Sequence, residues 1–434
     1  MTEGTSKGLY IVVAIVIFGI FVSLTYILFG DNLSPALQGF FGNATEQADK
    51  NLGGSKGIDY TGWKNVDSTR EENGYLITKV RSADSNGSDF WVKAEKTDDG
   101  KGLVISASSD MDIPNGFWES NHTGSSVVVN DDFVFPDLID GLPIVEFKDR
   151  VFNSAKLSGG LELPKGLAKI GNYAFFSSEI TGNFNAPDNL VSIGDSAFSK
   201  SQFTGELKLP KSIRTLGNHI FSFSRFTGDL VLPEGLETIG EHTFTGTYFD
   251  KGIVIPGTLK EIPSGAFVNT IFKGEITINK GVEKIGNNAF NSAQFTGDLI
   301  IPESVTYIGD TSFNRSKFNG SLTLPNNLTY IGNAAFQSSN FTGELDLPDN
   351  LTTLGSVAFQ DSLFTGNLIL PTNLTIIKAA TFQKSMFTGD LVIPSGLTSI
   401  ESAAFLNSNL DTVTKMNPDT VIGAGNFSTD TIIK

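Results

Sequence analysis

A 23-residue repeat that runs on without insertion limits this chain more than any other feature of its sequence. One position of the repeat holds proline in every unit except the one with Asn279, and a second position holds phenylalanine throughout. Such a strict period means that each unit stacks on its neighbours instead of folding alone. The sequence therefore predicts a β-rich repeat solenoid of 23-residue units over residues 141–410. The prolines are Pro164, Pro187, Pro210, Pro233, Pro256, Pro302, Pro325, Pro348, Pro371 and Pro394, and the phenylalanines are Phe152, Phe175, Phe198, Phe221, Phe244, Phe267, Phe290, Phe313, Phe336, Phe359, Phe382 and Phe405.

The first part of each unit predicts a short strand that ends at the proline. In Leu230–Leu232 the two leucines face inward and Val231 faces out, because side chains alternate along a strand. Proline lacks an N–H and fixes φ, so it ends the ladder. A Gly or Asn two residues later favours a turn with positive φ. These turn residues are Gly235, Gly281, Asn327, Asn350 and Asn373.

The second part predicts a short extended piece and one helical turn. Leu236 and Ile239 point into the core, and Gly240 precedes the lattice phenylalanine. We expect these phenylalanines to form a continuous aromatic spine, each burying about 150–250 Å². An F-T-G phrase closes the unit, and its glycine permits a tight corner. The phrase stands at Phe203–Gly205, Phe226–Gly228, Phe295–Gly297 and Phe341–Gly343, and we expect distorted corners where Pro263, Lys378 and Glu401 replace the lattice glycine and Lys251 replaces the F-T-G glycine.

The repeat resembles the BspA-like family of bacterial leucine-rich repeats, whose units follow roughly the pattern L-x-[IL]-P-x-x-[LV]-x-x-I-G-x-x-A-F. The resemblance covers residues 141–410, and the lead-in Asp140–Phe147 is also similar to that of the family. It implies an extracellular or cell-surface protein used in adhesion or in binding host or matrix proteins. It implies no catalytic residues.

The N-terminus predicts a membrane anchor over residues 1–30. Leu9–Phe29 carries no charge for 21 residues, which at a helical rise of about 1.5 Å matches the roughly 30 Å hydrocarbon core. A cleaved signal peptide would have a shorter apolar core and a small-x-small site. We expect the short N-terminus to stay inside and the remainder to be exported.

Residues 31–57 predict a juxtamembrane amphipathic helix and a Gly-rich linker. Apolar residues recur at helical spacing through Leu33–Leu52, and Asn51–Gly57 is typical of a flexible break. The helix either packs on its own domain or on lipid, or associates with copies of itself.

The repeat is flanked by two further segments. Residues 58–140 predict a small β-rich capping domain, since Tyr75–Lys79, Phe90–Lys93 and Leu103–Ser106 alternate in polarity between polar loops. Residues 411–434 predict a C-terminal cap, in which a partial unit ending at Phe427 shields the last phenylalanines.

Composition excludes several functions. The chain has 31 basic and 47 acidic residues, a formal charge of -16 and no cysteine. Nucleic-acid binding is disfavoured because the surface repels phosphates. A disulfide framework and a thiolate metal site are excluded.

Few residues predict chemistry, and we predict no catalytic residue, cofactor or metal. His219 and His242 were expected at different points of adjacent repeats, and His122 stands apart, so no histidine site is predicted. Asp84–Asp89 and Asp110–Asp112 hold oxygen ligands but lack the EF-hand spacing, so solvated turns are favoured over calcium sites. An acidic row follows the F-T-G glycine and is interpreted first as a solvated edge and second as a cation ladder. The row is Glu206, Asp229, Glu275, Asp298, Glu344 and Asp390.

One position between the two phenylalanines of each unit changes freely along the chain. Such variation on a rigid frame is how a solenoid presents a specific face, although relaxed selection at an exposed corner also explains it. The candidate partner-binding residues are Arg225, Tyr248, Ile271, Gln294, Lys317, Asn340, Leu363 and Met386; Glu179 and Gln202 hold the same position in earlier units.

The leading hypothesis is a membrane-anchored extracellular interaction protein that binds a protein or glycan ligand. The alternative is a surface filament in which Leu9–Leu52 forms a pilin-like helix and the solenoid is displayed outside. It departs from the type IV pilin pattern, because Val13 stands where that pattern has glutamate. An enzyme is disfavoured, since a repeat offers similar surfaces at every unit instead of one pocket.

Overall fold

The computed structural model describes residues 70–72, 75–81, 89–106, 128–129, 132–157, 159–427 and 431–434. The chain divides into two compact units, Met1–Thr61 and Gly62–Lys434, and the described residues belong to the second. Among them no helix has the length and apolar character to cross a membrane. The predicted anchor Leu9–Phe29 and the helix Leu33–Leu52 lie outside the described residues.

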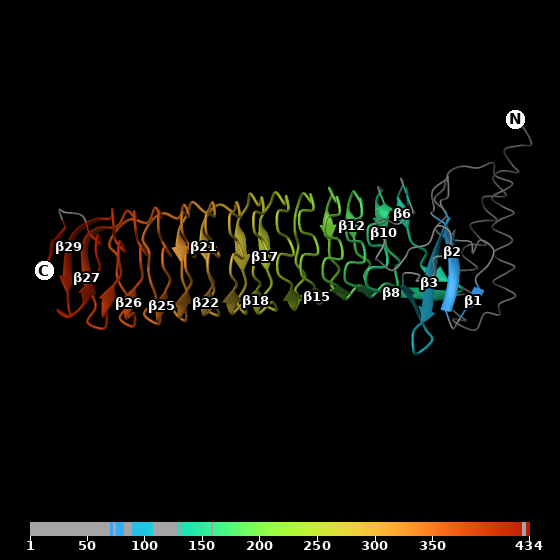
Figure 1. Ribbon diagram of the computed structural model, residues 1–434, viewed down its shortest axis with the longest axis horizontal. Coiled ribbons are helices and arrows are strands. Elements are labelled where there is room, and N and C mark those ends of the chain that lie inside the picture. The colour runs from blue at the N-terminus through green and yellow to red at the C-terminus, as the bar shows by residue number, and fades with distance from the viewer. Residues whose placement is uncertain are drawn as a thin grey trace, which may run out of the picture. The chain divides into compact units, whose positions relative to one another are not determined.

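The repeats stack as successive turns of a solenoid, and the leucine strand before each proline lines its first side (Figure 1). Pairing along this side is parallel, and paired residues are equivalents in adjacent units, as Ile253 and Ile276 are. The sheet is interrupted between β14 and β17, between β19 and β21 and between β23 and β27. The strands are β6 (Phe133–Val134), β10 (Leu161–Glu162), β12 (Phe184–Asn185), β14 (Leu207–Lys208), β17 (Ile253–Ile255), β19 (Ile276–Ile278), β21 (Leu299–Ile300), β23 (Leu322–Thr323), β27 (Thr388–Ile393), β29 (Asn409–Lys415) and β31 (Ile432–Ile433).

A second parallel ladder lines the next side of the solenoid. The inward residue of each unit before the last is buried, as Ile285 and Ile308 are, and the residue before it points outward. In the last unit Ile422 is half-buried. The strands are β8 (Leu142–Phe147), β11 (Lys169–Ile170), β13 (Ser192–Ile193), β15 (Thr215–Leu216), β16 (Thr238–Ile239), β18 (Glu261–Ile262), β20 (Lys284–Ile285), β22 (Tyr307–Ile308), β24 (Tyr330–Ile331), β25 (Thr353–Leu354), β26 (Ile376–Ile377), β28 (Ser399–Ile400) and β30 (Val421–Ile422).

The third side is not the predicted helical turn. Left-handed residues stand four positions apart in each unit, as at Asn288 and Ser292, with φ of 55° and 57°. A left-handed residue at both positions prevents the continuous i→i−4 bonding of a helix and turns N–H groups along the stack. The amides of Asn288, Phe290 and Ser292 accordingly donate to the following unit, at 2.8, 2.7 and 2.8 Å. The sequence prediction fails because non-glycine residues hold these positions.

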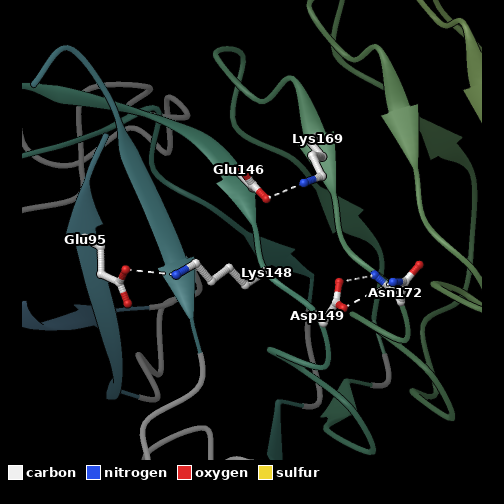
Figure 2. A network of polar contacts seen from close by, with 6 residues as sticks. All are labelled: Glu95, Glu146, Lys148, Asp149, Lys169 and Asn172. Atoms are coloured by element: carbon white, nitrogen blue, oxygen red, sulfur yellow. Dashed lines mark hydrogen bonds and ion pairs between the residues drawn. The ribbon is translucent and has the colours of Figure 1, made fainter. Parts of the chain in front are cut away.

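The N-terminal strands form an antiparallel sheet that continues into the second side. β1 (Arg70–Glu72), β2 (Tyr75–Arg81), β3 (Asp89–Lys96) and β4 (Leu103–Ser106) pair in order, and β4 then pairs parallel with β8. The strands predicted from alternation in this region are therefore confirmed. Lys148 reaches back to Glu95 at 2.8 Å across this junction (Figure 2). Two smaller pairings are β5 (Val128–Val129) with β9 (Lys156–Leu157), and β7 (Leu138–Ile139) with β8.

The predicted aromatic spine is confirmed, and a second one runs beside it. The lattice phenylalanines stack ring on ring with centroids 4.9–6.0 Å apart, as between Phe175 and Phe198 at 5.1 Å. The phenylalanines of the F-T-G phrase form the second spine, and Phe290 meets Phe295 edge to face at 5.9 Å. Phe405 stacks on Phe427 at 5.5 Å, so the partial last unit covers the spine as expected.

A ladder of Asp and Asn side chains links successive units beside the lattice glycine. The Asn172 Oδ1 accepts the backbone N–H of Asp195, and the Asp195 Oδ1 accepts that of Asn218, both at 2.7 Å. Figure 2 shows its first step, where Asn172 binds Asp149. The same bonds join Asn287, Asp310, Asn333 and Ser356.

This ladder explains why the lattice position holds glycine. A Cβ on Gly194 would lie 2.6 Å from the backbone nitrogen of Asn172. The second-side sheet breaks between β16 and β18 and between β25 and β26, where Pro263 and Lys378 replace the glycine. In the preceding unit Gly240 donates its N–H to the Leu216 carbonyl at 2.7 Å. Pro263 holds the equivalent position and has no N–H to donate. The distortion expected at these two corners is thus confirmed.

The other two expected corners differ from each other. Glu401 causes no break, since its N–H bonds Ile377 at 2.8 Å and β28 pairs on both sides, so that expectation is wrong. On the first side, pairing stops between Leu230 and β17, next to Lys251.

The turn after the proline also differs from the prediction. Gly281 has a φ of 121°, whereas Gly235, Asn327, Asn350 and Asn373 do not take a positive φ. Their turns close by a bond to the proline carbonyl, as Leu236 makes to Pro233 at 3.0 Å. The asparagines instead donate their side-chain N–H to the preceding unit, at 3.0 Å from Asn327 to Glu303. At the F-T-G corner Gly228, Gly297 and Gly343 have a positive φ, whereas Gly205 does not.

Truncating the spine should cost far more than truncating the exposed corner. Phe290 is fully buried and stacks on Phe267 and Phe313 at 5.3 Å. We expect Phe290→Ala to lower the free energy of unfolding by about 3–5 kcal/mol because it leaves a cavity. Gln294→Ala should stay within about 0.5 kcal/mol. Urea unfolding measures both, and equal losses would mean that the interior is assigned wrongly.

The Asp/Asn ladder gives a second stability prediction. Asp195→Ala leaves the part-buried N–H of Asn218 without its acceptor, so we expect a loss of about 1–3 kcal/mol. Asp195→Asn keeps an acceptor oxygen and should lose much less. Asp188, exposed after Pro187, is the control, and its change to alanine should stay within about 0.5 kcal/mol. If Asp195→Ala matched the control, the ladder would contribute nothing to stability.

Candidate functional site

Stacking converts each repeat position into a column of side chains, so a site on this molecule is a set of columns. Inward columns are filled by the two spines and by the strand leucines and isoleucines. Only outward columns can meet a partner. Four of them differ in chemistry and are described in turn.

The corner column contains the candidate partner-binding residues and lies between the third and first sides. Its side chains are exposed except that of Ile271, which is half-buried. Tyr248, Leu363 and Met386 expose 47, 41 and 44% of their area. Their unit-to-unit alignment follows from backbone bonds such as that from Arg225 to Phe203 at 2.8 Å. The structure brings the predicted residues together along one corner, and their role in binding stays a prediction.

The acidic row is exposed, and part of it is neutralised within the chain. Glu206 pairs with Lys208 at 3.0 Å, and Asp229 pairs with Lys251 at 3.2 Å. The Asp298 carboxylate accepts the N–H and hydroxyl of Ser321, and these bonds lower the pKa of Asp298. Further along, Asp390 accepts the Thr412 hydroxyl. The row therefore includes hydrogen-bonded carboxylates as well as solvated ones.

The outward column of the first side carries exposed aliphatic side chains, and sequence reasoning did not single it out as a site. Val231, Ile300 and Ile369 expose 67, 65 and 73% of their area, and Val254 and Val392 about half. In the earlier units the same position holds Glu162, Asn185 and Lys208. We call the column from 231 to 392 the strand-face stripe; its members are Val231, Val254, Thr277, Ile300, Thr323, Asp346, Ile369 and Val392. The sequence signal for this column is the change from polar residues at 162, 185 and 208 to mostly β-branched residues from Val231 onward.

The outward column of the second side is mostly polar, with Ile376 and Val421 as exposed exceptions, and some of its members pair with one another. Lys169 binds Glu146 at 2.8 Å, which raises the lysine pKa (Figure 2). Tyr307 and Tyr330 stack at 4.5 Å, so these rings cover each other. Burial, followed by the Asp310 charge, raises the pKa of Tyr330.

His219 and His242 form a stacked pair, contrary to the sequence interpretation. Their numbers differ by one period, so they hold the same point of adjacent units, and their rings stack at 4.9 Å. Both backbones are left-handed, with φ of 55° and 56°. Partial burial, followed by the His242 charge, lowers the pKa of His219.

No group of three or more acidic or histidine side chains that could hold a metal occurs in the part of the chain that the structure describes. The segment Asp110–Asp112, His122 and most of Asp84–Asp89 lie outside it. The calcium question for those loops stays open as a prediction from sequence.

The histidine pair predicts a pH dependence. Because the folded pKa of His219 lies below its usual 6.5, its contribution to stability is present above pH 6.5 and is lost as pH falls through the folded pKa. His219→Asn should reduce the stability difference between pH 7.5 and pH 5.5, as Asn288 holds the same left-handed position. Urea unfolding at both values tests this, and an unchanged difference would contradict it.

The repeat region matches a known family. The model for the BspA type leucine-rich repeat region matches residues 145–272, 251–343 and 318–434, in six copies. The chain is similar to solved structures of a T. pallidum leucine-rich repeat protein (24% identity, 46% of this chain and 85% of that one, TM-score 0.33) and of a leucine-rich cell surface protein from Faecalibacterium prausnitzii (15%, 83% and 95%, 0.40). It is also similar to the pneumococcal vaccine antigen PcpA (16%, 86% and 100%, 0.42). None of the curated proteins matches. Since the family model spans more than half of the chain, this protein belongs to the BspA-type leucine-rich repeat family.

Proposed function

We propose that this protein is a membrane-anchored extracellular interaction protein whose solenoid binds a protein or glycan partner. The observation that carries the proposal is the contrast between the buried and the exposed columns of the solenoid. The buried phenylalanine columns repeat unit after unit, whereas the corner column changes from Arg225 to Leu363 and Met386 on the same frame. A frame that stays constant while exposed columns change suits specific recognition.

Two further observations support this role. The family is a repeat family and indicates no catalytic activity. The exposed columns run along many units, so a partner can contact side chains from several repeats at once, which favours a large ligand over a small substrate.

The N-terminal segment supplies the membrane attachment in this proposal. Leu9–Phe29 has the length and the lack of charge that a membrane-spanning helix requires. The remainder, with its formal excess of acidic residues, is then held outside the cell beyond the Gly-rich segment Asn51–Gly57.

The proposal is tested by comparing residues 58–434 with the full chain. We expect the shorter protein to be monomeric and soluble, to bind cells or matrix protein, and to compete with the full chain for that binding. Light scattering and a cell-binding assay measure the two properties. A matched control carries Phe290→Ala, which should weaken binding only through loss of folded protein.

The filament alternative predicts the opposite result. In that case the shorter protein neither binds nor competes, and the full chain polymerises through Leu9–Leu52. Negative-stain microscopy of the full chain distinguishes fibres from dispersed molecules.

A further inference from the structure

The strand-face stripe has more exposed apolar area than folding requires. Its members point away from the core, because the residues on either side of each are the buried ones, as Leu299 and Ile301 are around Ile300. The units with Glu162, Asn185 and Lys208 at this position form the same strands. Threonine also favours a β-strand, and the column has threonine at Thr277 and Thr323. Strand formation therefore does not require an aliphatic residue here. Aliphatic exposure of 65–73% at Ile300 and Ile369 therefore needs another reason.

The acidic row borders this stripe two residues earlier on the same outward face. From Glu275 to Val392 the two columns contain five carboxylates and no lysine or arginine, the carboxylates being Glu275, Asp298, Glu344, Asp346 and Asp390. Among the described residues these five form no ion pair, whereas Glu206 and Asp229 at the other end have lysine partners. The stripe thus carries exposed aliphatic side chains at Ile300, Ile369 and Val392, with Thr277, Thr323 and Asp346 at its other positions. The row beside it is negative at four of its six positions.

The backbone of this face leaves little for a partner to bond. Where strands of this face pair, their N–H groups donate to the neighbouring unit, as Leu299 does to Ser321 at 2.9 Å and Ile301 to Thr323 at 3.0 Å. A partner strand cannot be added along the face, so recognition must use side chains. A partner whose own backbone bonds are satisfied internally, such as a helix, meets this condition.

The spacing along the stack fits a helix. Units on a parallel sheet repeat about every 4.7–4.9 Å, and a helix advances about 5.4 Å per turn. Residues three and four apart on a helix can therefore follow the stripe from Thr277 to Val392 with a small drift per unit. Lysines beside the apolar face of such a helix would then lie next to the acidic row.

We propose that the first side of the solenoid, from Glu275 to Val392, binds a cationic amphipathic helix of a partner protein. The helix lays its apolar face on Ile300, Ile369 and Val392 and its lysines or arginines on the carboxylates of the acidic row. This inference rests on the proposed interaction function and assigns it a face and a partner chemistry. It places binding on a different column from the corner that includes Leu363 and Met386.

The test uses the full chain in zwitterionic nanodiscs, with empty nanodiscs as the blank. The probe is a fluorescent 18-residue peptide designed with lysines flanking an apolar helical face, and fluorescence anisotropy gives its Kd. We expect binding that weakens with salt. The peptide with glutamate for lysine, and a scrambled peptide of the same composition, should not bind.

Paired variants separate the candidate columns. The first pair, Ile300→Thr with Ile369→Thr, introduces threonine, which the column already has in other units. The second pair, Glu275→Gln with Glu344→Gln, removes two charges at constant shape. Each pair should raise the Kd at least tenfold, and circular dichroism should confirm an unchanged fold. Leu363→Thr with Met386→Thr tests the corner column as the alternative site for the probe. Ile376→Thr with Val421→Thr, exposed on the second side, is the control that should leave the Kd unchanged.

The outcomes also separate this inference from the broader function. No binding of the probe, or an equal loss in the corner variants, overturns the inference. If the stripe variants instead abolish self-association seen by light scattering, a second copy covers the face and the inference is wrong. If cell or matrix binding persists in the stripe variants and fails in the corner variants, the interaction function stands and only its placement here is wrong.

Discussion

Parallel stacking at one constant period is the constraint on which the rest of this structure depends. Each backbone column bonds its own copy in the next unit, so any residue type that tolerates its own copy as a neighbour can be repeated. Aromatic rings satisfy that condition well, and the planes of Phe336 and Phe359 are within 2° of parallel. Asp and Asn satisfy it by accepting the next unit's N–H. The same condition favours glycine where the ladder passes closest to the preceding unit, although Glu401 takes that position with pairing intact on both sides.

The period made much of the fold predictable from sequence. The first-side strand, its buried leucines and the outward valine follow from alternation around Val231, and the spine follows from the phenylalanine lattice. The third side was not predictable in the same way. Its left-handed positions hold Tyr173, His219 and even the β-branched Val357, and propensity gives no reason to place such residues at positive φ. The bonds to the next unit impose that conformation.

The candidate surface was predictable only in part. Variation identified the corner around Leu363, because a change of residue type against a constant frame is visible in one sequence. The strand-face stripe was less visible, since valine and isoleucine in a strand are ordinary and their exposure depends on which side of the strand faces the core. The histidine pair was missed although His219 and His242 are one period apart, a relation that needs only the lattice to see.

The interruptions of the second-side sheet bear on how a partner could use this surface. At Pro263 and Lys378 the ladder stops, yet the lattice phenylalanines continue across both points, with centroids 5.5 Å apart from Phe244 to Phe267 and 5.8 Å from Phe359 to Phe382. The core therefore holds the units together where one sheet does not. A helix lying on the first side from Glu275 to Val392 would span the interruption between β23 and β27 on that side and the interruption at Lys378 on the second side. Its own stiffness would oppose bending there. Binding of such a partner should then protect the amides of the flanking units from exchange, which couples recognition on one side to the stability of the other.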